Sequence, residues 1–177
     1  VHLKQSASSY RDLTVIVGCV DNHLARRSIH RAVEPLQGYR RDEVPNIWWI
    51  DGGNGRSSGQ VLIGSQSKRT KPEHHFTGTS ICKSLPAPSV LHPDLLQPEE
   101  RSAVNPGAVS CPERIRLGEQ SLNINQRVAV EIGEMLTEMF LTRSLRRFAT
   151  YFDLETGTSR SLYCTPDTIA SAIQKRK

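Results

Sequence analysis

The feature that most constrains the fold is an apolar run over residues 13–20 that ends in the pair Asp21-Asn22. The run is rich in β-branched residues and does not alternate between apolar and polar positions, so it predicts a strand buried on both faces. Such strands are typical of parallel sheets covered by helices. Asp21 or Asn22 can cap a following helix that ends near Pro35. This pattern places a carboxylate at the sheet edge where open α/β folds bind ligands.

The length and composition predict one domain of a soluble protein. A chain of 177 residues can bury one core and leaves little room for a second. It has no apolar stretch long enough to span a bilayer and no apolar signal segment at its start, so we expect a cytoplasmic protein that does not bind membranes. The net charge of +5 is spread over small basic clusters that are not interleaved with aromatic residues, so nucleic acid is not an expected partner.

The four cysteines do not form a recognisable metal or disulfide pattern. Cys19, Cys82, Cys111 and Cys164 lie far apart, and no Cys-x-x-Cys pair is present. This spacing argues against a structural zinc site and against a disulfide framework. Cys19 lies in the predicted buried strand, so we expect its thiol to be unreactive.

Three further blocks of regular structure are predicted. Apolar runs at 46–51 and 59–64 flank a glycine-rich turn and indicate adjacent strands joined by a hairpin or a bulge. Residues 151–154 and 161–164 indicate a second, closing hairpin. Between them, apolar residues recur at three- and four-residue steps and predict a core-facing helix: Leu122, Val128, Ile132, Met135, Leu136, Met139 and Phe140.

The segment 65–112 differs from the rest of the chain. It holds seven of the ten prolines and lacks sustained periodicity, so it predicts a long surface excursion. Structureless segments of this length in compact domains often have a function, which makes a lid or an active-site crossover one interpretation. A flexible insertion is the other, and the sequence does not separate them.

Asp21 is the first candidate for chemistry. A carboxylate just past a strand is well placed to hold Mg²⁺ over nucleotide phosphates, because this hard cation prefers oxygen ligands. The alternative is that Asp21 only caps the helix, and the spacing alone favours the cap. Arg26 lies a little over one helical turn later and either points back to the same phosphates or stays solvated. Taken alone, its position favours a solvated side chain.

Three blocks, in this order, resemble the ThiF and ubiquitin-activating adenylyltransferases. The first is the Asp-Asn strand end, Val17-Gly18-Cys19-Val20-Asp21-Asn22, with Arg26 in the helix that follows. The other two resemble more narrowly the ThiF-like proteins of PRTRC plasmid systems. They are Ile50-Asp51-Gly52-Gly53-Asn54-Gly55-Arg56 with Ser58-Gly59-Gln60-Val61, and Ser110-Cys111-Pro112-Glu113 with Gln120-Ser121-Leu122 and Asn125.

The resemblance implies a specific activity. Family members use ATP and Mg²⁺ to adenylate the carboxyl-terminal glycine of a ubiquitin-like, β-grasp protein, and many pass the acyl group to a cysteine or a sulfur acceptor. By this resemblance Asp21, Asn22 and Arg26 would bind the nucleotide, and Asp21 would also hold Mg²⁺. Cys111 matches the position of the reactive cysteine, where a thiolate on a loop can attack the activated carbonyl. An ordinary loop residue is the alternative for Cys111.

The chain also departs from the family pattern. The phosphate-cradling Gly-x-Gly-x-x-Gly turn and the ribose-binding acidic residue are expected upstream of Leu13, and we expect this chain to start too late to hold them. The glycines at 52–55 do not replace them, because they lack a strand-turn-helix context. The Cys-x-x-Cys zinc ligands of many relatives are absent. Residues 1–177 therefore resemble the carboxyl-terminal part of a single adenylation domain, which alone would be inactive.

The predicted fold class is α/β, a partial Rossmann-like ThiF-type fold with a mixed sheet, a long crossover loop and a closing β-hairpin. Because half a sheet would leave an exposed edge, we expect a homodimer. ATP-dependent adenylation is the predicted function. A non-catalytic binding module of the same fold is the alternative, and a piece of a dinucleotide-binding oxidoreductase is a weaker third, because its glycine fingerprint is missing.

Overall fold

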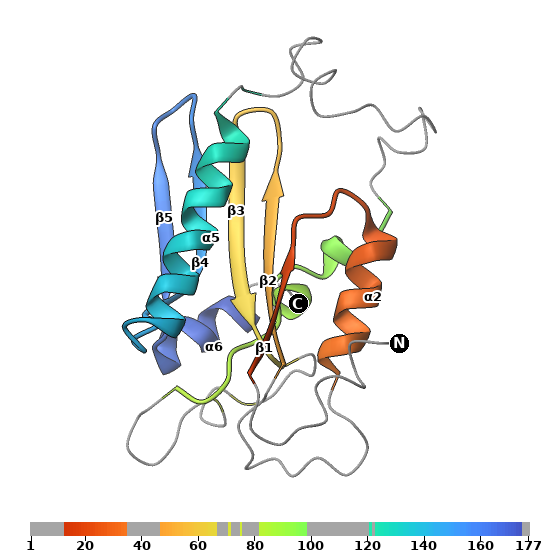
Figure 1. The fold of residues 1–177 in the computed structure, drawn as a ribbon, viewed down its shortest axis with the longest axis vertical. Helices are drawn as coiled ribbons and strands as arrows, with labels where there is room; N and C mark the ends of the chain where they lie inside the picture. Colours follow the sequence, from red (N-terminus) through yellow and green to blue (C-terminus); the bar gives the residue numbers. More distant parts are fainter. Residues whose placement is uncertain are drawn as a thin grey trace.

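The structure, a computed structural model, describes residues 13–34, 47–66, 71, 75, 82–98, 121 and 123–174. Five strands form one sheet in the order β1-β2-β3-β4-β5 (Figure 1). Their bounds are β1 Thr14–Gly18, β2 Ile47–Asn54, β3 Ser58–Gly64, β4 Arg147–Asp153 and β5 Ser159–Tyr163. β1 pairs parallel with β2, and every other pair is antiparallel. The predicted mixed sheet is therefore confirmed, although its parallel character is limited to one pair.

Helices cover both faces of the sheet. Their bounds are α2 His23–Val33, α3 Pro88–Leu91, the 3-10 helix η2 Pro93–Leu96, α5 Ile124–Phe140 and α6 Pro166–Gln174. α5 lies across one face, where Val128 and Ile132 approach Gly52 of β2 (Figure 1). α2 lies on the opposite face, where Ile29 approaches Gly18 of β1. Within the described part of the chain, no helix has the length and apolar character needed to cross a membrane.

The core joins segments that are far apart in the sequence. β2, β3 and β4 contribute its central residues, and α5 closes it from one side. Leu85, Leu91 and Leu95 from the segment 82–98 and Ile169 from α6 belong to the same cluster. Burial of these apolar side chains is the main driving force for folding, so the crossover segment is part of the folded unit.

Several predicted elements are confirmed. β2–β3 and β4–β5 are the two expected hairpins. Asn22 caps α2, since its Oδ1 accepts a hydrogen bond from the backbone N of Ala25 at 2.8 Å. The apolar stripe of α5 is buried at Val128, Ile132 and Met135, whereas Phe140 is exposed. Phe140 was therefore wrongly placed on the core face, and Leu122 lies outside the described residues.

The prediction that the first strand is buried on both faces is wrong. β1 lies at the end of the described sheet with β2 as its partner. Val17 is 43% exposed, and Cys19 is also exposed, so burial does not shield the Cys19 thiol. An apolar run without alternation shows only that apolar residues are tolerated on both faces of the strand. Whether each face is buried depends on other parts of the chain that pack over it.

Two other expectations are corrected near the carboxyl half. Residues 84–92 are buried, so this part of the segment 65–112 is not a surface excursion. Its prolines begin the short elements α3 and η2 and do not prevent packing. α6 was not predicted at all. The start of α6 has a signal in the sequence, because Thr165, a residue type that caps helices, precedes Pro166. In the structure Oγ1 of Thr165 accepts a hydrogen bond from the backbone N of Thr168.

Candidate functional site

The candidate site lies where the parallel strands β1 and β2 end together. The register pairs Gly18 with Asp51, so the turn after β1 and the acidic residue of β2 meet at one edge of the sheet. A Cβ atom at Gly18 would lie 2.8 Å from Nε1 of Trp49 and 3.0 Å from Cδ1 of Ile29. Glycine is therefore favoured here, because the side chains of Ile29 of α2 and Trp49 of β2 already occupy the space that a Cβ atom would need.

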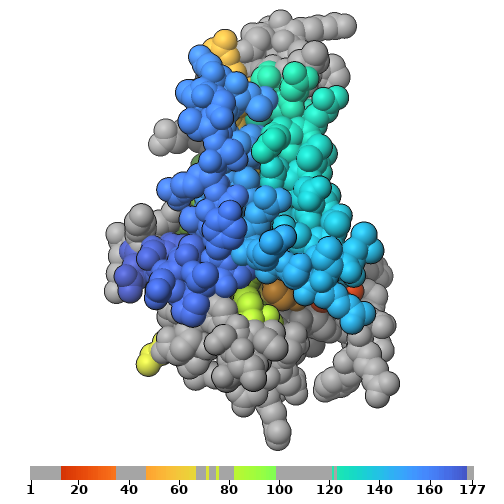
Figure 2. Space-filling view, turned by 90° about the vertical axis from the view of Figure 1, so that its left-hand side faces the viewer, coloured from red at the N-terminus to blue at the C-terminus, as the bar shows by residue number. Residues whose placement is uncertain are grey.

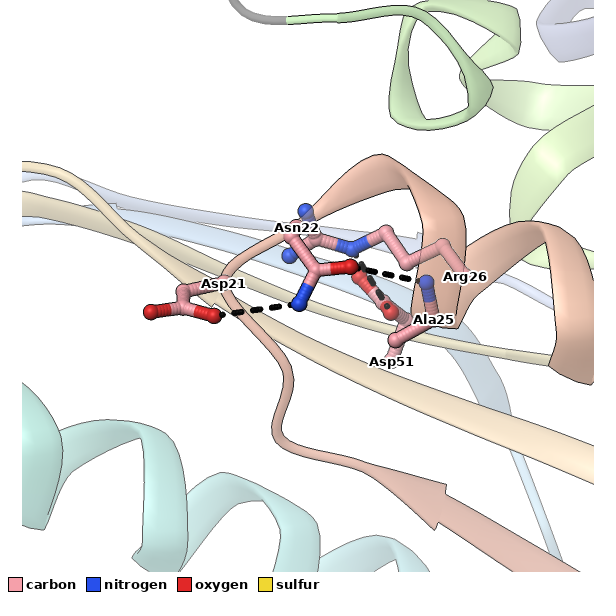
Figure 3. A network of polar contacts seen from close by, with 5 residues as sticks. All are labelled: Asp21, Asn22, Ala25, Arg26 and Asp51. Carbon is pink, nitrogen blue, oxygen red and sulfur yellow. Dashed lines mark hydrogen bonds and ion pairs between the residues drawn. The ribbon is translucent and has the colours of Figure 1, made fainter. Parts of the chain in front are cut away.

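Asp21 and Asn22 form the turn between β1 and α2. Asp21 is exposed, and its Oδ1 accepts a hydrogen bond from Nδ2 of Asn22 at 3.5 Å (Figure 3). The amide oxygen of Asn22 is already used to cap the helix. The carboxylate of Asp21 thus faces solvent beside the N-terminus of an 11-residue helix, whose dipole favours negative charge at this end.

Arg26 is buried, so the prediction of a solvated side chain is wrong. Its Nε donates a hydrogen bond to Oδ1 of Asp51 at 3.2 Å. Figure 3 shows the side chain running back toward the turn that carries Asp21 and Asn22. The alternative, that Arg26 points back toward phosphates bound beside Asp21, stays a prediction.

Asp51 is the residue that the sequence reasoning missed. Its side chain is completely buried, and burial raises its pKa to about 6 against the opposing effect of Arg26. Among the described residues its Oδ2 has no hydrogen-bond partner, and neither has Nε1 of Trp49, two positions earlier on the same strand. An acidic residue directly after the apolar run 47–50 was the available signal, because buried charges need a partner.

A cavity of about 890 Å³ lies on this side of the sheet and is lined in part by Arg26. Arg26 lies at its margin, and Gly53, Gln60 and Tyr151 contribute from β2, β3 and β4. Leu91 and Leu95 form part of its wall. Nε2 of His92 lies 2.7 Å from the hydroxyl of Tyr151 and so links this wall to β4.

The residues at the strand end suit a nucleotide with its Mg²⁺. This ion is commonly held by one or two carboxylates together with substrate phosphates, and one solvent-facing carboxylate at Asp21 meets that need. The described residues contain no group of three or more His, Cys, Asp or Glu side chains that would hold a metal without a substrate. Arg26 brings a guanidinium to the same edge, which suits phosphate. Cys111, the predicted acceptor, lies outside the described residues.

Comparison with known proteins does not assign the chain to a family. No protein-family model matches the sequence, and no curated protein matches it. The function is therefore inferred from the residues of the site.

Proposed function

We propose that this chain is the carboxyl-terminal part of an enzyme that adenylates the carboxyl-terminal glycine of a ubiquitin-like protein, using ATP and Mg²⁺. The observation that carries the proposal is the strand-end arrangement. Asp21 presents an exposed carboxylate at the start of α2, and Arg26 of the same helix runs back toward it. The sequence of this strand end resembles that of ThiF-type adenylyltransferases, which supports the same function. A ThiF-type fold, more specific than a mixed α/β sheet, is part of the proposal.

Each residue has a defined role in this proposal. Asp21 would bind the metal through a carboxylate oxygen, and the first backbone amides of α2 would attract phosphate oxygens. Bound ATP would supply the phosphorus atom that the glycine carboxylate attacks as pyrophosphate leaves. Arg26 would stabilise negative charge, while its hydrogen bond to Asp51 holds the guanidinium in place. Asp51 is thus a positioning residue, and Asn22 orients the turn through the helix cap.

A homodimer is part of the same proposal. Apolar side chains are exposed at the β1 end of the sheet, namely those of Leu13, Val17 and Leu24. An edge strand with neighbouring exposed apolar residues favours association with another chain. Transfer of the acyl group to Cys111 also belongs to the proposal as a second, separable step.

The test is ATP–pyrophosphate exchange by the intact protein that carries this chain, with its ubiquitin-like substrate. Asp21→Asn should reduce exchange by roughly 100-fold or more, because it removes the charge that would hold the metal. Its melting temperature should fall only slightly, because Asp21 is exposed and the described residues give it a single hydrogen bond, from Asn22, while the loss of charge beside the helix N-terminus costs little. Asp167→Asn is the matched control, because Asp167 is an exposed carboxylate near the N-terminus of another helix, α6.

Two outcomes would contradict the proposal in different ways. Normal exchange by Asp21→Asn would remove Asp21 from the site while leaving the activity in place. No exchange by the wild-type intact protein would instead support the binding module. Cys111→Ser separates the two steps, because it should abolish a thiol-sensitive adduct while exchange continues.

A further inference from the structure

A small polar recess with a glycine at its base lies on the cavity side of the sheet. Gly53 of β2 pairs with Gln60 of β3, and residues directly opposite each other in a sheet present their side chains to the same face. A Cβ atom at Gly53 would lie 3.5 Å from Nε2 of Gln60 and 3.9 Å from Nη2 of Arg26. All three residues line the large cavity. Two nitrogen donors therefore converge on the space that Gly53 leaves open, which we call the Gly53 recess.

Arg26 brings buried hydrogen-bond donors to the Gly53 recess. Its side chain is only 8% exposed. Within the described part of the chain, its one side-chain hydrogen bond runs from Nε to Asp51. Figure 3 shows the two terminal nitrogens lying beyond that contact. Buried donors of a charged group need acceptors, and two neighbouring N–H groups of a guanidinium match the two oxygens of a carboxylate. The terminal edge of Arg26 is thus suited to a carboxylate ligand.

The charged groups of the cavity lining also favour an anion. Four of the described lining residues are charged, namely Arg26, Asp94, Asp153 and Arg160. The side chain of Asp94 is 72% exposed, and Arg160 is exposed as well. Oδ1 of Asp153 already accepts hydrogen bonds from two backbone N–H groups of its own turn, at 2.8 and 2.9 Å. Arg26 is the one buried member of the four, so the charged group in the inner part of the lining is a cation.

The remaining lining adds apolar surface to this polar recess. Leu91 of α3 and Leu95 of η2 line the cavity and are buried. Leu162 of β5 and Ala172 of α6 line it from two elements at the surface of the molecule, which Figure 2 shows in blue. Ligand sites of about 890 Å³ typically combine apolar walls with a few polar groups that fix the orientation of the ligand. This cavity therefore fits a carboxylate that is carried on an apolar body.

We propose that the cavity binds a small-molecule monocarboxylate with an apolar body, whose carboxylate lies in the Gly53 recess. The carboxylate accepts hydrogen bonds from the terminal nitrogens of Arg26 and from the amide of Gln60. The apolar body displaces water from the leucine side chains of the lining. This site shares Arg26 with the proposed nucleotide site, but binding needs neither ATP nor Mg²⁺. Failure of this proposal would therefore leave the proposed adenylation untouched, and the reverse also holds.

The experiment titrates the full chain with 4-phenylbutyrate by isothermal titration calorimetry, without nucleotide or Mg²⁺. We expect a dissociation constant of roughly 0.1–1 mM, as is usual for a ligand of this size. The neutral analogue 4-phenylbutanol has the same apolar body and should bind at least about 10-fold more weakly, because it lacks the charge. Acetate has the carboxylate without the body and should bind more weakly still.

Three results with these probes would overturn the proposal. The first is equal affinity for 4-phenylbutyrate and 4-phenylbutanol, since the charge would then play no part. The second is the absence of binding at about 10 mM 4-phenylbutyrate, well above the expected dissociation constant. The third is tighter binding of 4-phenylbutyl phosphate than of the acid, which would assign the recess to phosphate.

Gly53→Ala tests the Gly53 recess directly. The added methyl group would make ordinary contacts at 3.5 and 3.9 Å, so the fold should tolerate it, but it fills the space proposed for the carboxylate. Affinity for 4-phenylbutyrate should fall at least about 10-fold, the value of a hydrogen bond to a charged group. Gln60→Leu keeps a side chain of similar size without donors and should also weaken binding.

Gly133→Ala is the matched control, because it adds the same methyl group on α5, where nothing lies within 4 Å. It should bind 4-phenylbutyrate with wild-type affinity. The melting temperature of each variant shows that it is folded. A folded Gly53→Ala variant that binds 4-phenylbutyrate as tightly as the wild type would place the ligand elsewhere and overturn the proposal.

Discussion

The two faces of the sheet are covered in different ways. On one face, the single helix α5 buries Ile124, Val128, Ile132 and Met135 against the strands. On the other, α2, the adjacent short elements α3 and η2, and α6 come from three separate parts of the chain and border a cavity of about 890 Å³. One long helix fills a sheet face continuously, whereas several short elements leave space where they meet. The candidate site lies on the face with that space.

The same contrast holds for the buried carboxylates. Glu131 of α5 pairs with Arg127 at 2.7 Å and Arg147 at 3.5 Å, whose side chains are 42% and 23% exposed. Asp51 pairs with Arg26, whose side chain is only 8% exposed. The first group is a partly hydrated ion-pair network at the rim of a packed face. The second is a dehydrated pair beside a cavity, which is the setting in which functional groups are usually found.

Core truncations should give the largest difference between the two faces. Met135→Ala removes a fully buried side chain from the filled face and should lower the free energy of unfolding by roughly 4 kcal/mol. Leu95→Ala enlarges a cavity that already exists, so its cost should be at the low end, roughly 2 kcal/mol. Urea unfolding of both variants measures this. Equal losses would show that the cavity face is packed as tightly as the other.

Asp51 should make a pH-dependent contribution of intermediate size to the free energy of unfolding. Burial raises the pKa of this carboxyl from 3.8 to about 6 in the folded protein, so between these values the folded chain keeps a proton that the unfolded chain has released. The stabilising contribution of this group is therefore complete below about pH 4 and is lost as the pH rises through 6, by about 3 kcal/mol.

Asp51→Asn isolates this contribution, because the amide does not titrate. The free energy of unfolding of the wild type, measured relative to that of Asp51→Asn, should fall as the pH rises from 4 to 7. Titration of all other carboxyls cancels in the difference. If the free energy of unfolding changed with pH in the same way for both proteins, the effect of Arg26 on the pKa of Asp51 would fully offset the effect of burial.

Glycine substitutions should give the smallest effects, with opposite signs at two positions. At Gly18 a methyl group would lie 2.8 Å from a side-chain atom of Trp49, so Gly18→Ala should destabilise the protein by roughly 1 kcal/mol, the low end of the cost of overpacking. At Gly133 of α5 nothing lies within 4 Å of the added atom, so Gly133→Ala should stabilise it by ~1 kcal/mol. Thermal unfolding of the pair tests this. A neutral Gly18→Ala variant would show that the strand end is looser than described.

The elements that were predicted correctly depend on near neighbours in the chain. The β2–β3 hairpin follows from two apolar runs around a glycine-rich turn. The start of α2 follows from the Asn22 cap, and the seam of α5 from its helical periodicity. Asp21 was identified as a candidate for the same reason, because a strand end and a helix start define its position locally.

The sequence by itself determined the α/β class, the two hairpins and the acidic turn at Asp21, because hydrogen bonds and caps between nearby residues specify them. Only the tertiary structure decided the exposure of β1 at the sheet edge, the burial of residues 84–92 and the Arg26–Asp51 pair. Each of these depends on strand register or on packing between distant segments. Periodicity shows which side chains prefer burial, but it does not show which distant partner covers them.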